Sequence, residues 1–108
     1  MKFKVHFISD AEDDLFEIYK FVYLNDSEEA AEKLYDKLYQ KCLTLRVIPG
    51  RGHIPNELKL LEIDSYLEIL CKPYRIIYQI IEDDVFVHCI LDGRRDLQTL
   101  LQERLLRE

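Results

Sequence analysis

The clearest structural signal in this sequence lies between Pro73 and Leu97, which read PYRIIYQIIEDDVFVHCILDGRRDL. Apolar side chains alternate along residues 74–81, and a second apolar run follows at 85–91. A period of two indicates β-strands, and the acidic residues between the runs indicate a turn. The stretch therefore predicts an antiparallel hairpin in which Tyr78 and Val87 lie in adjacent strands. The second strand is apolar on both faces except at His88, which predicts a central position in the sheet.

The remaining segments complete an α/β (α+β) domain that we expect to span residues 1–108 as one unit. Residues 3–7 alternate as a strand, and residues 11–24 carry apolar side chains at helical spacing. A second helix is expected to begin after a cap at Asp26 or Ser27 and to end before Pro49. Residues 49–65 contain two prolines and two glycines and are predicted to form a loop. Residues 66–71 are predicted as a strand, and Asp96 as the cap of a last helix.

This order of elements predicts an antiparallel three-strand meander preceded by a strand and a helical hairpin. The helical hairpin should cover one face of the sheet. The other face should stay partly open, unless the last helix or a partner covers it. Large exposed apolar surfaces usually mark an interface, so a partner protein is expected there.

Composition excludes several classes of protein. The net charge of −6 argues against a protein that coats nucleic acids through lysine and arginine. Residues 1–45 hold ten acids and six bases, so the N-terminal part carries most of the imbalance. No apolar run approaches the roughly 18 residues of a membrane span, and no signal peptide is apparent, which predicts a cytoplasmic protein. The three widely spaced cysteines indicate buried thiols, and neither a metal nor a cofactor is expected.

These features resemble the RelE/ParE superfamily of bacterial toxins. The resemblance rests on the strand PYRIIYQI, the strand end LDGRRDL, the early AEDDLFEIY and the loop PGRGH, and it covers nearly the whole chain. It implies a toxin of a two-gene, type II toxin–antitoxin module, neutralised by a cognate antitoxin in a hetero-oligomer. RelE-like members of the superfamily cut mRNA on the ribosome, whereas ParE-like members poison DNA gyrase.

The RelE-like branch would require a catalytic set for metal-independent RNA cleavage: a base, an acid and cations around the phosphate. The resemblance gives Arg75 and Arg95 as the cations and Glu68 as a candidate base, with His88 a weaker candidate for the acid. The set is incomplete, because the strand at 66–71 has no lysine and the last helix has no tyrosine or histidine. Arg75 could also pair with Glu68 across the strands, which would make it unavailable to phosphate.

The acidic charge and the incomplete catalytic set favour the ParE-like branch, in which the protein inhibits gyrase by protein–protein contact. The residues predicted to contact the target or the antitoxin are Arg94, Arg95, Tyr66, Ile77, Ile81, Phe86 and Ile90. Alternatively, the two arginines pair with Asp92 and Asp96 and stabilise the corner. Two other functions stay open: a ribosome-dependent mRNA endonuclease, and an inactive relative that only binds its antitoxin.

Overall fold

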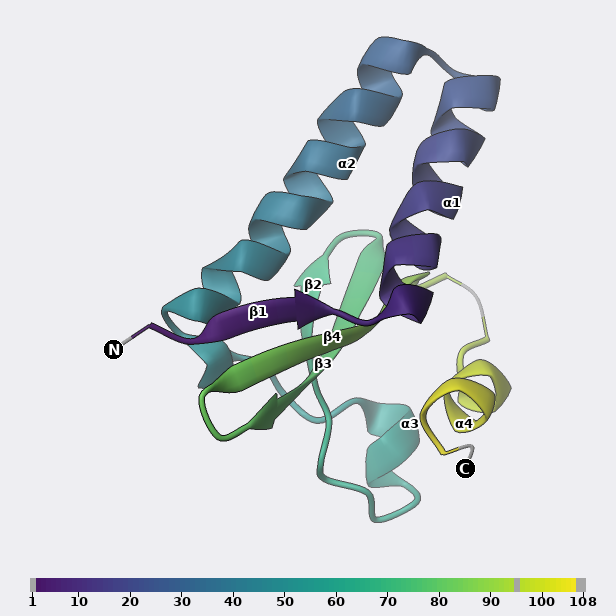
Figure 1. The fold of residues 1–108 in the computed structure, drawn as a ribbon. Coiled ribbons are helices and arrows are strands. Elements are labelled where there is room, and N and C mark those ends of the chain that lie inside the picture. Colours follow the sequence, from purple (N-terminus) through teal and green to yellow (C-terminus); the bar gives the residue numbers. More distant parts are fainter. Residues whose placement is uncertain (1, 95, 107–108) are drawn as a thin grey trace.

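A computed structural model describes residues 2–94 and 96–106 of the chain. It has the mixed α+β fold that the sequence predicts (Figure 1). The elements are β1 (Lys4–Phe7), α1 (Ser9–Asn25), α2 (Glu28–Leu43), η1 (Thr44–Arg46), η2 (Pro49–Arg51), α3 (Asn56–Lys59), β2 (Leu67–Cys71), β3 (Tyr74–Ile81), β4 (Asp84–Asp92) and α4 (Gln98–Leu105). The stretch predicted as a loop therefore contains a 3₁₀ turn and the one-turn helix α3.

The sheet has the strand order β1-β4-β3-β2. Strands β2, β3 and β4 form the predicted antiparallel meander, and Tyr78 lies opposite Val87 as expected. Strand β4 is central because β1 adds to its free edge in parallel, with Val5 opposite Val85. The position and direction of β1 had not been predicted.

A β-bulge in β4 changes which side chains face which side of the sheet. Ile77 pairs with Cys89 and the next residue, Tyr78, pairs with Val87, so His88 is the extra residue. An extra residue reverses the alternation of the strand beyond it. Before the bulge Val87 faces the helical hairpin, and after it Cys89 faces the opposite side.

Helices α1 and α2 pack on one face of the sheet and form the larger core. Leu15, Leu38 and Cys42 from the helices contact Ile76 and Tyr78 of the sheet in one buried cluster. The upper half of the helical hairpin extends beyond the sheet (Figure 1), so its side chains have no strand beneath them. Its second helix is capped as predicted, because the Ser27 hydroxyl accepts a hydrogen bond from Ala30 N at 3.0 Å.

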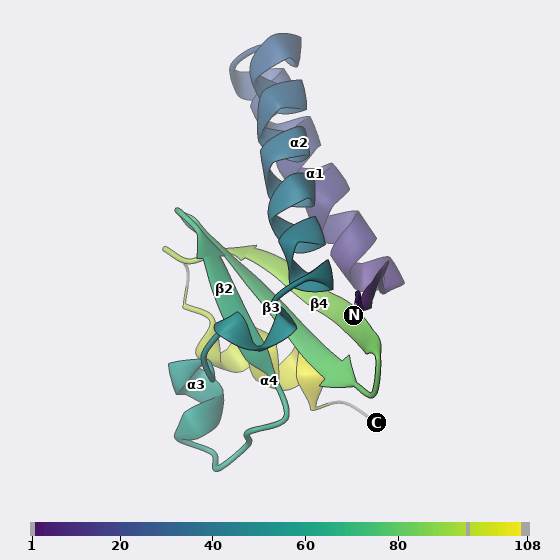
Figure 2. The ribbon, with the colours of Figure 1, turned by 90° about the vertical axis from the view of Figure 1, so that its left-hand side faces the viewer.

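Helix α4 closes the other face of the sheet (Figure 2). Leu97 and Leu101 bury Ile77, Cys89 and Leu91 in a second, smaller cluster. The last helix therefore covers this face, which is one of the two possibilities that the sequence left open, and these side chains need no partner protein to bury them.

The prediction was wrong for two interface candidates in particular. Ile77 is fully buried beneath α4, and Ile90 is 1% exposed on the side of the helical hairpin, since the bulge turns it there. Ile77 therefore cannot contact a partner in this fold, and Ile90 keeps almost no exposed surface of its own.

Candidate functional site

Arg75 lies in a compact ionic cluster. Its Nη1 and Nη2 donate to the two carboxylate oxygens of Glu57 at 2.6 and 2.7 Å, and its Nε donates to Glu68 at 2.7 Å. The Arg75 side chain is 15% exposed and that of Glu68 is 6% exposed. Charge-assisted, bidentate pairs of this kind are the strongest hydrogen bonds in proteins. The pairing of Arg75 with Glu68, which the sequence offered as an alternative, is therefore present and is extended by Glu57 from α3.

His53 completes the cluster from the other side. Its Nε2 lies 2.8 Å from the second carboxylate oxygen of Glu68, while its backbone exchanges two hydrogen bonds with Glu68. The His53 side chain is 59% exposed, but its ring is held by a buried carboxylate. The cluster thus contains two carboxylates, one imidazole and one guanidinium, and Glu68 lies within hydrogen-bonding distance of both His53 and Arg75.

The loop before α3 is fixed by Gly52 and Tyr78. Gly52 N donates to the Tyr78 hydroxyl at 3.2 Å, and that hydroxyl donates to Pro49 O at 2.6 Å. A Cβ atom on Gly52 would lie 2.5 Å from the hydroxyl and 2.6 Å from Glu68 O, so only glycine fits. The PGRGH motif therefore supports the position of Glu68 and His53.

The cluster shifts the pKa values of its members. Hydrogen bonding to Arg75 lowers the pKa of Glu57 although burial opposes this effect. The two carboxylates raise the pKa of Arg75, with Glu57 the largest cause. Arg75 is consequently a permanently charged group whose charge two carboxylates already neutralise.

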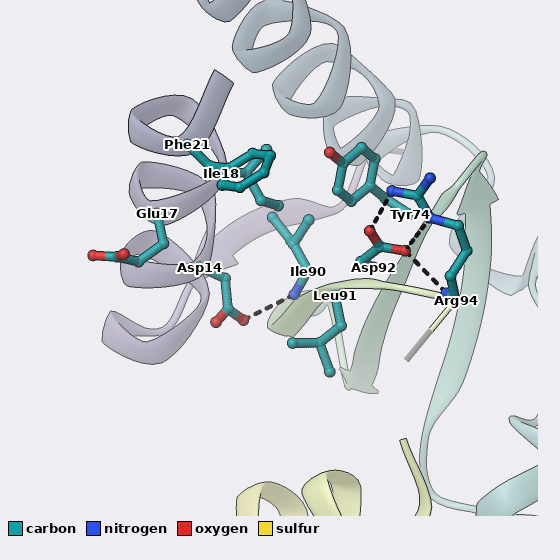
Figure 3. Close-up of a pocket in the computed structure, with 9 residues that line it drawn as sticks. All are labelled: Asp14, Glu17, Ile18, Phe21, Tyr74, Ile90, Leu91, Asp92 and Arg94. Atoms are coloured by element: carbon teal, nitrogen blue, oxygen red, sulfur yellow. Dashed lines mark hydrogen bonds and ion pairs between the residues drawn. The ribbon is translucent and has the colours of Figure 1, made fainter. Parts of the chain in front are cut away.

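A hollow of about 380 Å³ lies between α1 and the end of β4 (Figure 3). Its apolar floor comes from Ile18, Phe21 and Ile90, and acidic groups stand on its rim. At its far end Arg94 Nη2 donates to Asp92 at 2.6 Å, with the Arg94 side chain 73% exposed. The pairing of Arg94 with Asp92, offered above as the alternative, is present, yet the guanidinium stays open to a partner. Arg95 lies outside the described residues.

Asp14 joins α1, the bulge and α4. Its Oδ2 accepts from Ile90 N at 3.0 Å and from Arg104 Nη2 at 2.9 Å. Arg104 also donates to His88 O at 3.1 Å, so α4 is tied to the bulged strand. Among the described residues this network was the one least visible in the sequence, because its members are separated by up to 90 positions.

His88 packs as a strand residue and does not join the Arg75 cluster. Its Nε2 lies 3.2 Å from Gln79 Oε1, and its ring meets the edge of Tyr66 at 5.3 Å. Burial and the nearby Arg104 lower the pKa of His88, which favours the neutral ring. A neutral histidine away from Arg75 and Glu68 is not placed to act as their acid.

The other predicted contact residues are scattered. Ile81 is 49% exposed at the end of β3, and Phe86 is half-buried against His6, with ring centroids 5.0 Å apart. Tyr66 is half-buried, and its hydroxyl donates to Leu105 O at 3.3 Å. These three side chains do not form one surface with Arg94.

Over the described residues, no group of His, Cys, Asp and Glu side chains is arranged to hold a metal ion. Within the same residues, no helix has the length and apolar character needed to span a membrane.

Comparison with known proteins identifies the family. The family described as ParE toxin of the type II toxin–antitoxin system parDE matches residues 5–97. The chain therefore belongs to the ParE toxin family and is a toxin of the type II toxin–antitoxin class. Its fold is similar to a solved structure titled "Chromosomal ParDE TA system from P. aeruginosa", with a TM-score of 0.69 and 15% identity over 82% of this chain and 94% of that chain. No curated protein matches the sequence.

Proposed function

We propose that this toxin inhibits DNA gyrase in the cytoplasm by protein–protein contact and that a cognate antitoxin neutralises it. The choice of mechanism rests on one observation, which is that the guanidinium of Arg75 is paired with two carboxylates. Cleavage of RNA without a metal needs a cation free to stabilise the developing phosphorane charge. Arg75 instead donates to Glu57 and Glu68, which supports a structural role for it.

The hollow beside Arg94 is the surface that we propose to contact gyrase. It combines an apolar floor at Phe21 and Ile18 with an exposed guanidinium at its end. Exposed apolar patches rimmed by polar residues often mark protein-binding sites, and arginine is frequent among residues that dominate binding energy. This assignment extends the predicted role of Arg94 to residues of α1.

A ribosome-dependent mRNA endonuclease is the second candidate, because one observation favours it. Glu68, predicted as the base, lies within 2.7 Å of Arg75 and 2.8 Å of His53. If an RNA substrate displaced Glu57 from Arg75, then Glu68 as the base, His53 and the cation Arg75 would all lie beside the same phosphate. The two mechanisms predict different products, so they can be separated directly.

The test is purified toxin added to gyrase, relaxed plasmid and ATP, with a parallel reaction on translated message. We expect loss of supercoiling and intact message, and we expect added antitoxin to restore supercoiling. Phe21→Ala combined with Arg94→Ala should weaken inhibition, whereas Lys59→Ala on α3 serves as a matched exposed control. Cut message with normal supercoiling would establish the endonuclease instead. If cells expressing the toxin grow normally and neither activity is found, the chain is an inactive relative.

A further inference from the structure

The helical hairpin carries the whole net charge of the protein. Residues 9–43 contain ten acids and four bases, which give −6, while the other eleven acids and eleven bases of the chain cancel. This part of the molecule also projects beyond the sheet (Figure 1). A segment that is both extended and strongly acidic attracts cationic partners and repels anionic ones.

A continuous series of aromatic rings runs along the hairpin, and we call it the aromatic ladder: Phe7, Tyr39, Tyr35, Tyr19 and Tyr23. Successive ring centroids lie 5.3, 6.4, 6.0 and 6.1 Å apart. The rings remain accessible, since Tyr35 is 41% and Tyr23 is 46% exposed. Of the five rings, Phe7 also packs against the core that Leu15 and Leu38 help to form, whereas Tyr35 and Tyr23 are exposed.

Carboxylates accompany the ladder at regular spacing on both helices. Glu12 lies seven residues before Tyr19, and Glu28 lies seven residues before Tyr35, two helical turns in each case. Glu32 and Glu28 raise the pKa of Tyr19 after the larger effect of burial, which indicates that the acids of α2 lie near the ring of α1. No described base forms an ion pair with Glu12, Glu28 or Glu32, whereas Glu17 and Glu29 pair with Lys20 and Lys33.

At the base of the ladder the rings enclose a small hollow. Its volume is about 280 Å³, and Phe7, Glu12, Leu15, Phe16, Tyr35 and Tyr39 line it. Aromatic faces beside a carboxylate are the chemistry that binds a guanidinium or an ammonium group. The volume is below the range of typical small-molecule pockets, so it suits one long side chain.

We propose that the aromatic ladder binds a lysine- and arginine-rich segment of the cognate antitoxin, with one cationic side chain in the hollow beside Glu12. The site is separate from the hollow at Arg94, to which we assign gyrase. The inference rests on the proposed function only in taking an antitoxin as the partner. The charge of the hairpin sets the chemistry of that partner, because an acidic segment would be repelled.

The first test is the affinity of the full-length toxin for the antitoxin encoded beside it, measured by calorimetry. Glu12→Lys combined with Glu32→Lys should weaken binding at least about tenfold, because each change replaces an attraction by a repulsion. Asp83→Lys combined with Glu103→Lys makes the same change in net charge outside the hairpin and should leave binding unchanged. Equal weakening in both double variants would overturn the proposal, since it would reflect net charge alone.

The second test separates cation binding from apolar contact. Tyr35→Phe keeps an aromatic face and should retain affinity, whereas Tyr35→Leu removes the face at similar volume and should weaken binding several-fold. Unaltered binding by both variants would overturn the proposal. Circular dichroism and thermal melting must show that each variant is folded.

A third test measures supercoiling by gyrase with the same variants. It distinguishes failure of the antitoxin inference from failure of the proposed gyrase inhibition. We expect the hairpin variants to inhibit gyrase normally while antitoxin fails to rescue them. Loss of gyrase inhibition with antitoxin binding intact would assign the ladder to the target and overturn the proposal. If wild-type toxin binds antitoxin through the ladder but never affects gyrase, the proposed function fails and this inference stands.

Discussion

The Arg75 cluster and the helical hairpin use carboxylates in opposite ways. In the cluster, Glu57 and Glu68 are largely buried, and each accepts hydrogen bonds from the guanidinium of Arg75. On the hairpin, Glu12 and Glu32 stand exposed, and no described base pairs with them. Acidic residues therefore hold the fold together in one region and remain available for recognition in the other.

The difference follows from how far each carboxylate is removed from water. A buried charge lowers the stability of the fold unless it is paired. Loss of one member of the cluster should therefore destabilise the protein, because it leaves a buried charge without its partner. An exposed charge keeps its hydration and contributes little to stability. Substitutions in the two regions should consequently differ in their effect on unfolding.

The largest effect is expected from Arg75→Ala. It leaves Glu57 without a cationic partner and Glu68 with His53 alone in a mostly buried site, which should lower the free energy of unfolding by about 3–5 kcal/mol. Denaturant unfolding measures this loss. When Glu57→Gln and Glu68→Leu are added to Arg75→Met, most of the stability should return, because neither carboxylate is left unpaired in the site. A small loss of unfolding free energy in Arg75→Ala would show that the charges of the cluster contribute no more to stability than those of the hairpin.

Gly52→Ala should have the next largest effect, about 1–3 kcal/mol, because the added Cβ meets the Tyr78 hydroxyl and Glu68 O. Thermal melting provides the measurement. Gly50→Ala is the matched control, since a Cβ at that position has nothing within 4 Å. If both variants melt alike, close packing does not fix the loop beneath the cluster.

Acid should weaken the ion pair between Glu57 and Arg75. The pKa of Glu57 is lower in the folded protein than its usual value of about 4.3, so the pairing contributes fully above that pH. The contribution is lost as the pH falls through the lower, folded value. Unfolding free energies between neutral pH and pH ~3 should therefore decline less in Glu57→Gln than in the wild type. Parallel curves for the two proteins would contradict this.

The smallest effect is expected on the hairpin. Glu12→Gln combined with Glu32→Gln should change the free energy of unfolding by no more than about 0.5 kcal/mol, because both side chains are exposed and unpaired. The same denaturant titration as for Arg75→Ala allows direct comparison. If this variant lost as much unfolding free energy as Arg75→Ala, the carboxylates of the hairpin would be as important for stability as those of the cluster.

Local patterns in the sequence were sufficient for most elements and for the family. Alternation fixed the pairing of Tyr78 with Val87, and helical spacing identified both long helices. The cap of the second long helix could be narrowed to Asp26 or Ser27, and Ser27 is the one observed, because capping depends on residues only three positions apart. Such features are encoded within a few residues, so they survive without knowledge of the tertiary structure.

The candidate site was only partly predictable. Arg75 and Glu68 were paired from strand geometry, because they lie on neighbouring strands of one hairpin. Glu57 was missed because it lies in the stretch taken as a loop, 18 residues from Arg75. The acidic face of the hairpin was visible as composition, although its relation to the aromatic rings was not.

By itself, the sequence determined the order of elements, the meander and the excess of acid in the N-terminal part. Only the tertiary structure decided that β1 joins β4, that α4 closes the second face and that His88 is a bulge. The bulge places Val87 and Cys89, which are two residues apart, on opposite faces of the sheet. A pattern of alternating residues records that a strand is buried, but which neighbour buries each face depends on contacts between segments far apart in the chain.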